Sequence, residues 1–152
     1  MELVGQVAKA KGVEIKIGFE GMSGTLGSFQ WQVLAPTATA SEASDSNDAS
    51  LVILMESNDF SVLFLGDLGE AGQERLLTRN PRVFALLASK TLVTKVAHHG
   101  SADQSPTFYR ALDSEYLVFQ SARMTMDTPP ARLYHLPGKV VLRFLGPTSL
   151  DT

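Results

Sequence analysis

The sequence contains no cysteine, and His98, His99 and His135 are its three histidines among 152 residues. The chain therefore has no disulfide and no thiolate ligand, so any metal must be held by His, Asp, Glu or Asn side chains. No apolar run reaches the roughly 18 residues that a membrane-spanning helix needs. The opening segment MELVGQVAKAKG also lacks the charged and then apolar pattern of a signal peptide. We therefore expect the chain to be soluble.

Excess charge is lacking as well, because 13 basic and 16 acidic residues leave a net charge of −3. This balance gives no overall attraction for nucleic acid, although it leaves room for a local basic groove. What is present is an ordinary globular composition, with 44% hydrophobic residues, and enough length to bury a core. We expect one domain over residues 1–152. Within it, the small and polar residues 36–50 are typical of a surface loop.

Short alternating or apolar segments are interleaved with amphipathic ones along the chain. The first part is rich in predicted strands and the later part mixes strands with helices, which predicts an α/β (α+β) domain with a mixed sheet and flanking helices. Residues 18–27 read as a glycine-rich turn region, and 57–59 as the turn of a hairpin. Strands are expected at 13–17, 28–34, 51–56, 60–66, from 91 up to the histidines, 116–120 and 140–144, and helices at 2–11, 69–79, 82–89, 105–112 and 129–135.

Two of the apolar strands end in polar, glycine-flanked residues. Asp67 follows FSVLFLG, and His98, His99, Gly100 and Ser101 follow TLVTKVA. Ligands collect at the carboxyl ends of strands in α/β proteins, and carboxylate and imidazole are the usual ligands of zinc or manganese. Since adjacent side chains of a strand face opposite ways, one histidine should face the site while the other supports it.

Each of these residues also has a simpler interpretation. Asp67 alone is more often the N-cap of a following helix, here one that begins near Gly69. A histidine at a strand end is commonly a hydrogen-bonded structural residue, and the pair formed by Asn47 and its neighbour is more often part of a turn than a ligand. Lys95 is interpreted as a residue on the solvent face of its strand.

The segments NDASLV, LGDLG and VTKVAHHGS, in this order, resemble the metallo-β-lactamase-like domain of the ComEC family of DNA-uptake proteins. The resemblance runs from about Gly12 to about Ser121, and extends to free-standing hydrolases related to that domain. It implies a four-layer αββα sandwich with a metal site at the sheet ends, and hydrolysis of a phosphodiester, here of a DNA strand. It implies that Asp67, His98 and His99 are the catalytic and metal-binding residues, for Zn or Mn. Asn47 and Ser101 would be supporting groups.

The sequence also departs from this family. It has no N-terminal His-x-Asp-x-Asp-His or His-x-His-x-Asp-His signature, which supplies about half of the family's ligands. The family's downstream Asn and Tyr-Gly-His-Pro motif should fall near residues 121–130, which read SARMTMDTPP. Whether Asp127 replaces that histidine stays open, and His135 is interpreted as a surface residue. The chain is then either the C-terminal part of the sandwich without its N-terminal half, which the helix at 2–11 favours, or a relative that has lost metal chemistry.

The expected function is that of a metal-dependent phosphodiester hydrolase domain, a DNA nuclease, that is inactive or nearly so as this fragment. One alternative is a non-catalytic module that binds DNA or a protein; another is a stand-alone hydrolase of a small phosphoester. Basic residues in the last third would contact phosphate, although a solvated face is the simpler interpretation. They are Arg123, Arg132, Lys139 and Arg143.

The resemblance implies three partners and a location. The partners are single-stranded DNA, the rest of a membrane-embedded parent protein and a second copy of the chain, since half a sandwich leaves a sheet surface uncovered. The location is a soluble domain of a bacterial membrane protein, on the extracytoplasmic side.

Overall fold

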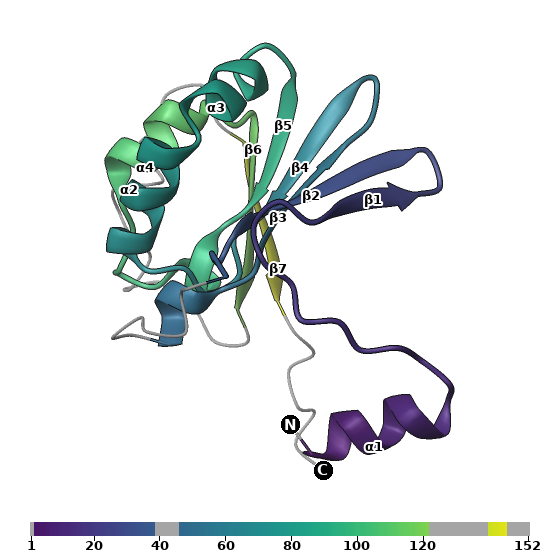
Figure 1. Cartoon of the computed structure of the whole chain (residues 1–152). Coiled ribbons are helices and arrows are strands. Elements are labelled where there is room, and N and C mark those ends of the chain that lie inside the picture. Colours follow the sequence, from purple (N-terminus) through teal and green to yellow (C-terminus); the bar gives the residue numbers. More distant parts are fainter. Residues whose placement is uncertain (1, 39–45, 122–139, 146–152) are drawn as a thin grey trace.

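A computed structural model describes residues 2–38, 46–121 and 140–145. It is built on one seven-stranded mixed sheet in which the strands follow the order of the sequence (Figure 1). The strands are β1 (Ser23–Leu26), β2 (Phe29–Ala35), β3 (Val52–Glu56), β4 (Phe60–Phe64), β5 (Thr91–Lys95), β6 (Tyr116–Ser121) and β7 (Val140–Leu145). The helices are α1 (Glu2–Ala10), α2 (Glu70–Arg79), α3 (Pro81–Leu87) and α4 (Pro106–Leu112), with 3-10 turns η2 (Ser46–Ala49) and η3 (Ala97–Gly100).

The sheet changes character at β4. Strands β1 to β4 pair antiparallel, whereas β4 to β7 pair parallel. Parallel neighbours need crossover connections, which are right-handed and therefore place successive helices on the same face when the strands progress in one direction. Figure 1 shows α2, α3 and α4 together on one side of the sheet. The carboxyl ends of β4, β5 and β6 consequently meet at one edge.

The hydrophobic core lies between the sheet and these helices. Leu54, Leu63, Leu92 and Leu117 come from successive strands and are at most 1% exposed. From the helix side, the ring of Phe108 packs edge-on against Phe84 and Tyr109, with centroids 5.7 and 5.4 Å apart. This covered face accounts for the alternation that the sequence shows in the strands.

The opposite face of the sheet is apolar but is not covered by any helix within the described residues. The register pairs Trp31 with Met55, Met55 with Val62 and Val62 with Val93, so these side chains share this face. They are only partly buried. Phe64, two residues after Val62 in β4, lies on the same face and is 40% exposed. We call this surface the open face.

The N-terminal segment stands apart from the body (Figure 1). Helix α1 ends as predicted near Gly12, which has φ 64°, but the strand predicted at 13–17 does not form. Among the described residues, residues 13–17 have no neighbouring strand to pair with, and Ile17 is 86% exposed. None of the described helices is long and apolar enough to cross a bilayer.

The other predicted elements of the described ranges appear within a few residues. The hairpin at 57–59 is confirmed, with Ser57 N donating to Phe60 O at 2.9 Å, and Ser105 caps α4 by accepting from Phe108 N at 3.3 Å. Strand β1 was missed inside the predicted glycine-rich turn. Within the predicted loop 36–50, the described part includes η2, while 39–45 and the predicted helix 129–135 lie outside the described residues. The α/β class with a mixed sheet and flanking helices is confirmed, and its helix and sheet layers are consistent with an α/β sandwich.

Candidate functional site

Asp67 lies in a sharp turn directly after β4. Gly66 adopts φ 57°, which favours glycine, and a Cβ there would make a tight contact of 3.2 Å with Leu51 O. Asp67 N donates to Ser50 Oγ at 3.1 Å, which holds the turn against the start of β3. The Asp67 side chain is 49% exposed. Its carboxylate is therefore presented at the edge of the sheet.

The simpler interpretation of Asp67 as a helix N-cap is wrong. The N-cap of α2 is Gly69, which makes no side-chain capping bond. The first backbone N–H of the helix, that of Glu70, donates instead to Asp103 Oδ1 at 3.2 Å. Asp103 thus reaches across from the histidine loop to cap α2. The carboxylate of Asp67 is not used for this purpose.

The two histidines lie beyond β5, in η3. His98 (φ 46°, ψ 44°) and His99 (φ 54°, ψ 17°) are left-handed, and Gly100 also has positive φ, 80°. The prediction that the pair would alternate across a strand is therefore wrong, because the strand ends at Lys95. Non-glycine residues in this region cost about 1–3 kcal/mol each, and such strain clusters at functional sites. A Cβ on Gly100 would lie 2.5 Å from the Phe119 ring, which fixes glycine there.

The turn after β4 and the turn after β5 meet at this edge. His99 Nε2 is 3.7 Å from Asp67 Oδ1, and His98 N donates to Gly66 O at 3.0 Å. His98 Nδ1 is buried and has no hydrogen-bond partner among the described residues. The structure thus places the side chain of His99 beside that of Asp67, and the backbone of His98 against the same turn.

Lys95 lies on the open face, in agreement with the favoured prediction, because the register pairs it with Phe64. Its amino group nevertheless reaches the turn that carries Asp67. Its side chain is partly buried, and Nζ donates to Gly66 O at 3.3 Å. Burial lowers the pKa of Lys95, while the negative charge of Asp67 counteracts this. The site therefore contains a cation as well as potential metal ligands.

The two predicted supporting residues take different places. Asn47 lies in η2, where its carbonyl oxygen accepts from Ser50 N at 3.0 Å, and Ser50 in turn holds the Asp67 backbone. Ser101 closes the histidine turn, with its N donating to His98 O at 2.9 Å. Asp127 and His135 lie outside the described residues, as do Arg123, Arg132, Lys139 and the side chain of Arg143.

Sequence reasoning missed a set of buried polar side chains behind the site. Gln73, Gln104 and Tyr109 are at most 5% exposed and hydrogen-bond to one another. Burial raises the pKa of the Tyr109 phenol. The glutamines give no signal in the sequence, because a glutamine in an amphipathic segment is usually solvated. The role of Ser50 could have been predicted from the sequence, since Ser50 belongs to the NDASLV segment.

The donors of this edge fit part of a metal site. Asp67 and His99 offer a carboxylate and an imidazole 3.7 Å apart, and the buried, unpaired Nδ1 of His98 is a nitrogen donor in the same turn. Over the described ranges, however, no three His, Asp, Glu or Cys side chains converge. A hydrolytic zinc or manganese centre needs at least three protein ligands. The arrangement is therefore a partial ligand set.

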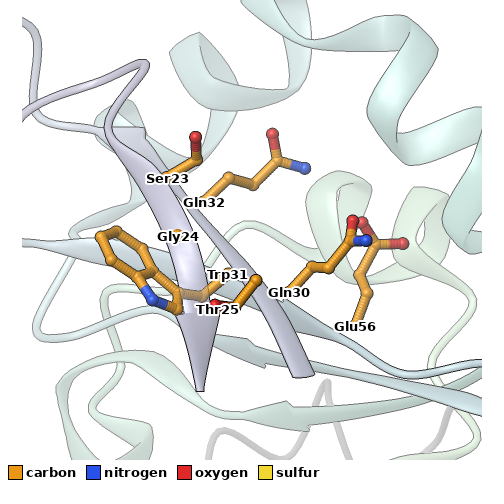
Figure 2. A pocket seen from close by; sticks show the side chains of 7 residues that line it. All are labelled: Ser23, Gly24, Thr25, Gln30, Trp31, Gln32 and Glu56. Atoms are coloured by element: carbon orange, nitrogen blue, oxygen red, sulfur yellow. The ribbon is translucent and has the colours of Figure 1, made fainter. Parts of the chain in front are cut away.

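A separate hollow lies at the other end of the sheet. It has a volume of about 350 Å³ and is lined by Ser23, Gly24, Thr25, Gln30, Trp31, Gln32 and Glu56 (Figure 2). Glu56 pairs with Ser61 near the start of β4, whereas Asp67 follows the end of that strand. The Glu56 carboxylate is also engaged by Lys90 Nζ at 3.2 Å. The hollow is thus remote from the Asp67 and histidine edge and offers one carboxylate that is already paired.

No protein-family model matches the sequence. It is 28% identical over 150 residues to ComE operon protein 3 of Bacillus subtilis (strain 168). The match covers 98% of this chain but 17% of that protein, so the chain spans about a sixth of its relative's length. This weak homology supports the ComEC resemblance of the motifs and says nothing specific about a metallo-β-lactamase-like domain.

Proposed function

We propose that this chain contributes Asp67, His98 and His99 to a metal-dependent phosphodiester hydrolase domain, a DNA nuclease, in a ComEC-like DNA-uptake protein. The observation that carries the proposal is the approach of His99 Nε2 to 3.7 Å from Asp67 Oδ1, beside the buried and unpaired Nδ1 of His98. The similarity to ComE operon protein 3 supports the link to DNA uptake. The motif order supports a metallo-β-lactamase-like domain.

The residues of this chain would have different roles, according to their chemistry. Asp67, His98 and His99 would hold zinc or manganese, with further ligands from the rest of the parent protein. The metal would supply Lewis acidity, which lowers the pKa of bound water and offsets the charge of a phosphate. Lys95 Nζ, whose charge lies beside Asp67, would attract and orient a phosphate oxygen. The backbone of the histidine turn keeps the imidazoles at the sheet edge.

A metal titration tests this proposal. We expect the 152-residue chain to bind Mn²⁺ or Zn²⁺ weakly, and Asp67→Ala, His98→Ala and His99→Ala each to weaken binding further. Asp59→Ala is the matched control, because Asp59 is an exposed carboxylate in the β3–β4 turn at the opposite edge. Elemental analysis and calorimetric titration give the readout.

Two outcomes would contradict the proposal. Metal binding that is absent from the wild-type chain, or equal in the Asp67 and Asp59 variants, would remove Asp67 as a ligand. We also expect little or no nuclease activity from the isolated chain, because its described ligand set is partial. Robust DNA hydrolysis that is lost in Asp67→Ala would show instead that the chain completes the site by itself.

The shortage of ligands among the described residues favours a second candidate, a non-catalytic module that binds DNA or a protein through the same edge. DNA binding without metal, with a steep dependence on salt, would support it. A stand-alone hydrolase of a small phosphoester would use the chemistry proposed above. Cleavage of a chromogenic phosphodiester without cleavage of single-stranded DNA would identify that case.

The proposed parent is a membrane-embedded protein that carries this domain on the extracytoplasmic side, where incoming single-stranded DNA would reach it. The open face would pack against the rest of that parent or, in the isolated chain, against a second copy. The oligomeric state tests the latter.

A further inference from the structure

A buried network of hydrogen bonds, on the helix side of the sheet, connects the turn after β4 with the turn after β5. We propose that Gln104, held by Gln73 and Tyr109, is a positioning residue that fixes the His98–Gly100 turn relative to the Asp67 turn. This inference rests on the proposed function, in which the two turns act together. It assigns a role to side chains that bind the backbone and the hydroxyl on either side of the histidines.

Gln104 brackets the histidine turn. Its Nε2 donates to Ala97 O at 3.2 Å, just before the histidines, and to Ser101 Oγ at 3.4 Å, just after them. Its Oε1 accepts from Gln73 Nε2 at 3.1 Å and from Tyr109 OH at 2.8 Å. An amide with both donor and acceptor engaged is held in a single orientation. Both ends of the left-handed turn are therefore attached to one rigid group.

Gln73 carries the connection to the Asp67 turn. It is 0% exposed, and its Nε2 donates to Leu68 O at 2.7 Å, the residue after Asp67. Its Oε1 accepts from Ser105 N at 2.9 Å, at the start of α4. One side chain of α2 thus contacts the turn after β4, Gln104 and the segment that follows the histidines. The separation of the two turns is set by Gln73 and Gln104 together.

Tyr109 supplies the remaining support from α4. Its hydroxyl accepts from Ala97 N at 3.1 Å and donates to Gln104 Oε1 at 2.8 Å. Both the N–H and the C=O of Ala97 are consequently bound, one by Tyr109 and the other by Gln104. The backbone that leads into the strained turn is therefore held on both of its polar groups. Outer groups of this kind commonly orient the ligands of a metal site.

The chain offers a matched control for this network. Thr94 Oγ1 and Ser114 Oγ form another buried hydrogen bond, of 2.7 Å, in the same layer between sheet and helices. Thr94 lies in β5, as part of the strand that leads to the histidines, but its hydroxyl contacts neither turn of the site. Loss of this bond should lower stability without changing the ligand geometry.

The test compares Gln104→Ala and Tyr109→Phe with Thr94→Val in the full chain. The first readout needs no metal and is the ring ¹H–¹⁵N NMR spectrum of His98 and His99. We expect Gln104→Ala and Tyr109→Phe to shift or broaden these signals, and Thr94→Val to leave them unchanged at a comparable loss of stability. The second readout is the affinity for MnCl₂ and ZnCl₂, which should fall about tenfold or more in the first two variants.

The outcomes separate this inference from the proposed function. If the wild-type chain binds neither metal, the proposed function fails while the ring spectra still test the positioning. If the ring spectra of both network variants match wild type, the positioning role is overturned even where metal binding persists. Tyr109→Phe keeps the ring in the core, so it preserves the test should Gln104→Ala fail to fold.

Discussion

The two faces of the sheet are made by alternate residues of the same strands, yet one face is buried and the other is partly exposed. On the face covered by α2, α3 and α4, Leu63 is 0% exposed, and its immediate neighbour Phe64 on the open face is 40% exposed. Both faces are apolar. The difference shows that the pattern of a strand specifies which residues share a face, but not whether anything covers that face.

The covered face should determine the stability of the body. We expect Leu63→Ala to lower the free energy of unfolding by about 2–5 kcal/mol, because it leaves a cavity in a closed core. The control, Val62→Ala in the same strand, removes a partly buried side chain of the open face and should cost about 1 kcal/mol or less. Urea unfolding of both variants gives the comparison. Equal losses at a protein concentration too low for self-association would mean that the open face is covered within the monomer.

The open face should determine self-association. We expect substitutions there to change the oligomeric state more than the free energy of unfolding. We expect a dimer or larger species at micromolar concentration, and Phe64→Ser should shift it toward monomer because that ring lies in the exposed apolar surface. Leu86→Ser is the matched control, since Leu86 is 67% exposed on α3. Light scattering measures the mass. A wild-type monomer across this range would contradict the prediction.

The smallest change in the free energy of unfolding is expected for the two carboxylates near the start of α2. Asp103→Ala should lower the free energy of unfolding by about 1 kcal/mol, because it removes the acceptor of the first N–H of α2. Asp67→Ala should cost less, since Asp67 caps no helix in the structure. Urea unfolding distinguishes the two carboxylates. A larger loss for Asp67→Ala would restore a structural role for that residue.

Most elements of the described fold could be predicted from the sequence, because their signals are local. Ser105 followed by proline predicted the start of α4, and apolar periodicity predicted β2 to β6. The segment 13–17 alternates as a strand should, but a strand forms only where a neighbour offers its hydrogen bonds. That requirement is not local, and the prediction failed for this reason.

The residues of the candidate site could be named from the sequence, but their geometry could not. The strand ends pointed to Asp67, His98 and His99, and the structure places His99 within 3.7 Å of Asp67. The conformation of the histidine turn could not be read, because positive φ at two histidines is imposed by surrounding contacts. Gln104 and Tyr109 were missed since their role depends on long-range packing, which leaves no mark in the residues next to them.

The left-handed conformation of His98 and His99 has a consequence for how this turn can vary. Glycine or asparagine would occupy the same backbone at lower energy, but neither offers an imidazole. Substitutions that lower the backbone strain of this turn therefore remove the imidazole nitrogens from the proposed site. At these two positions, a more stable backbone and the proposed metal-binding function therefore favour different residues.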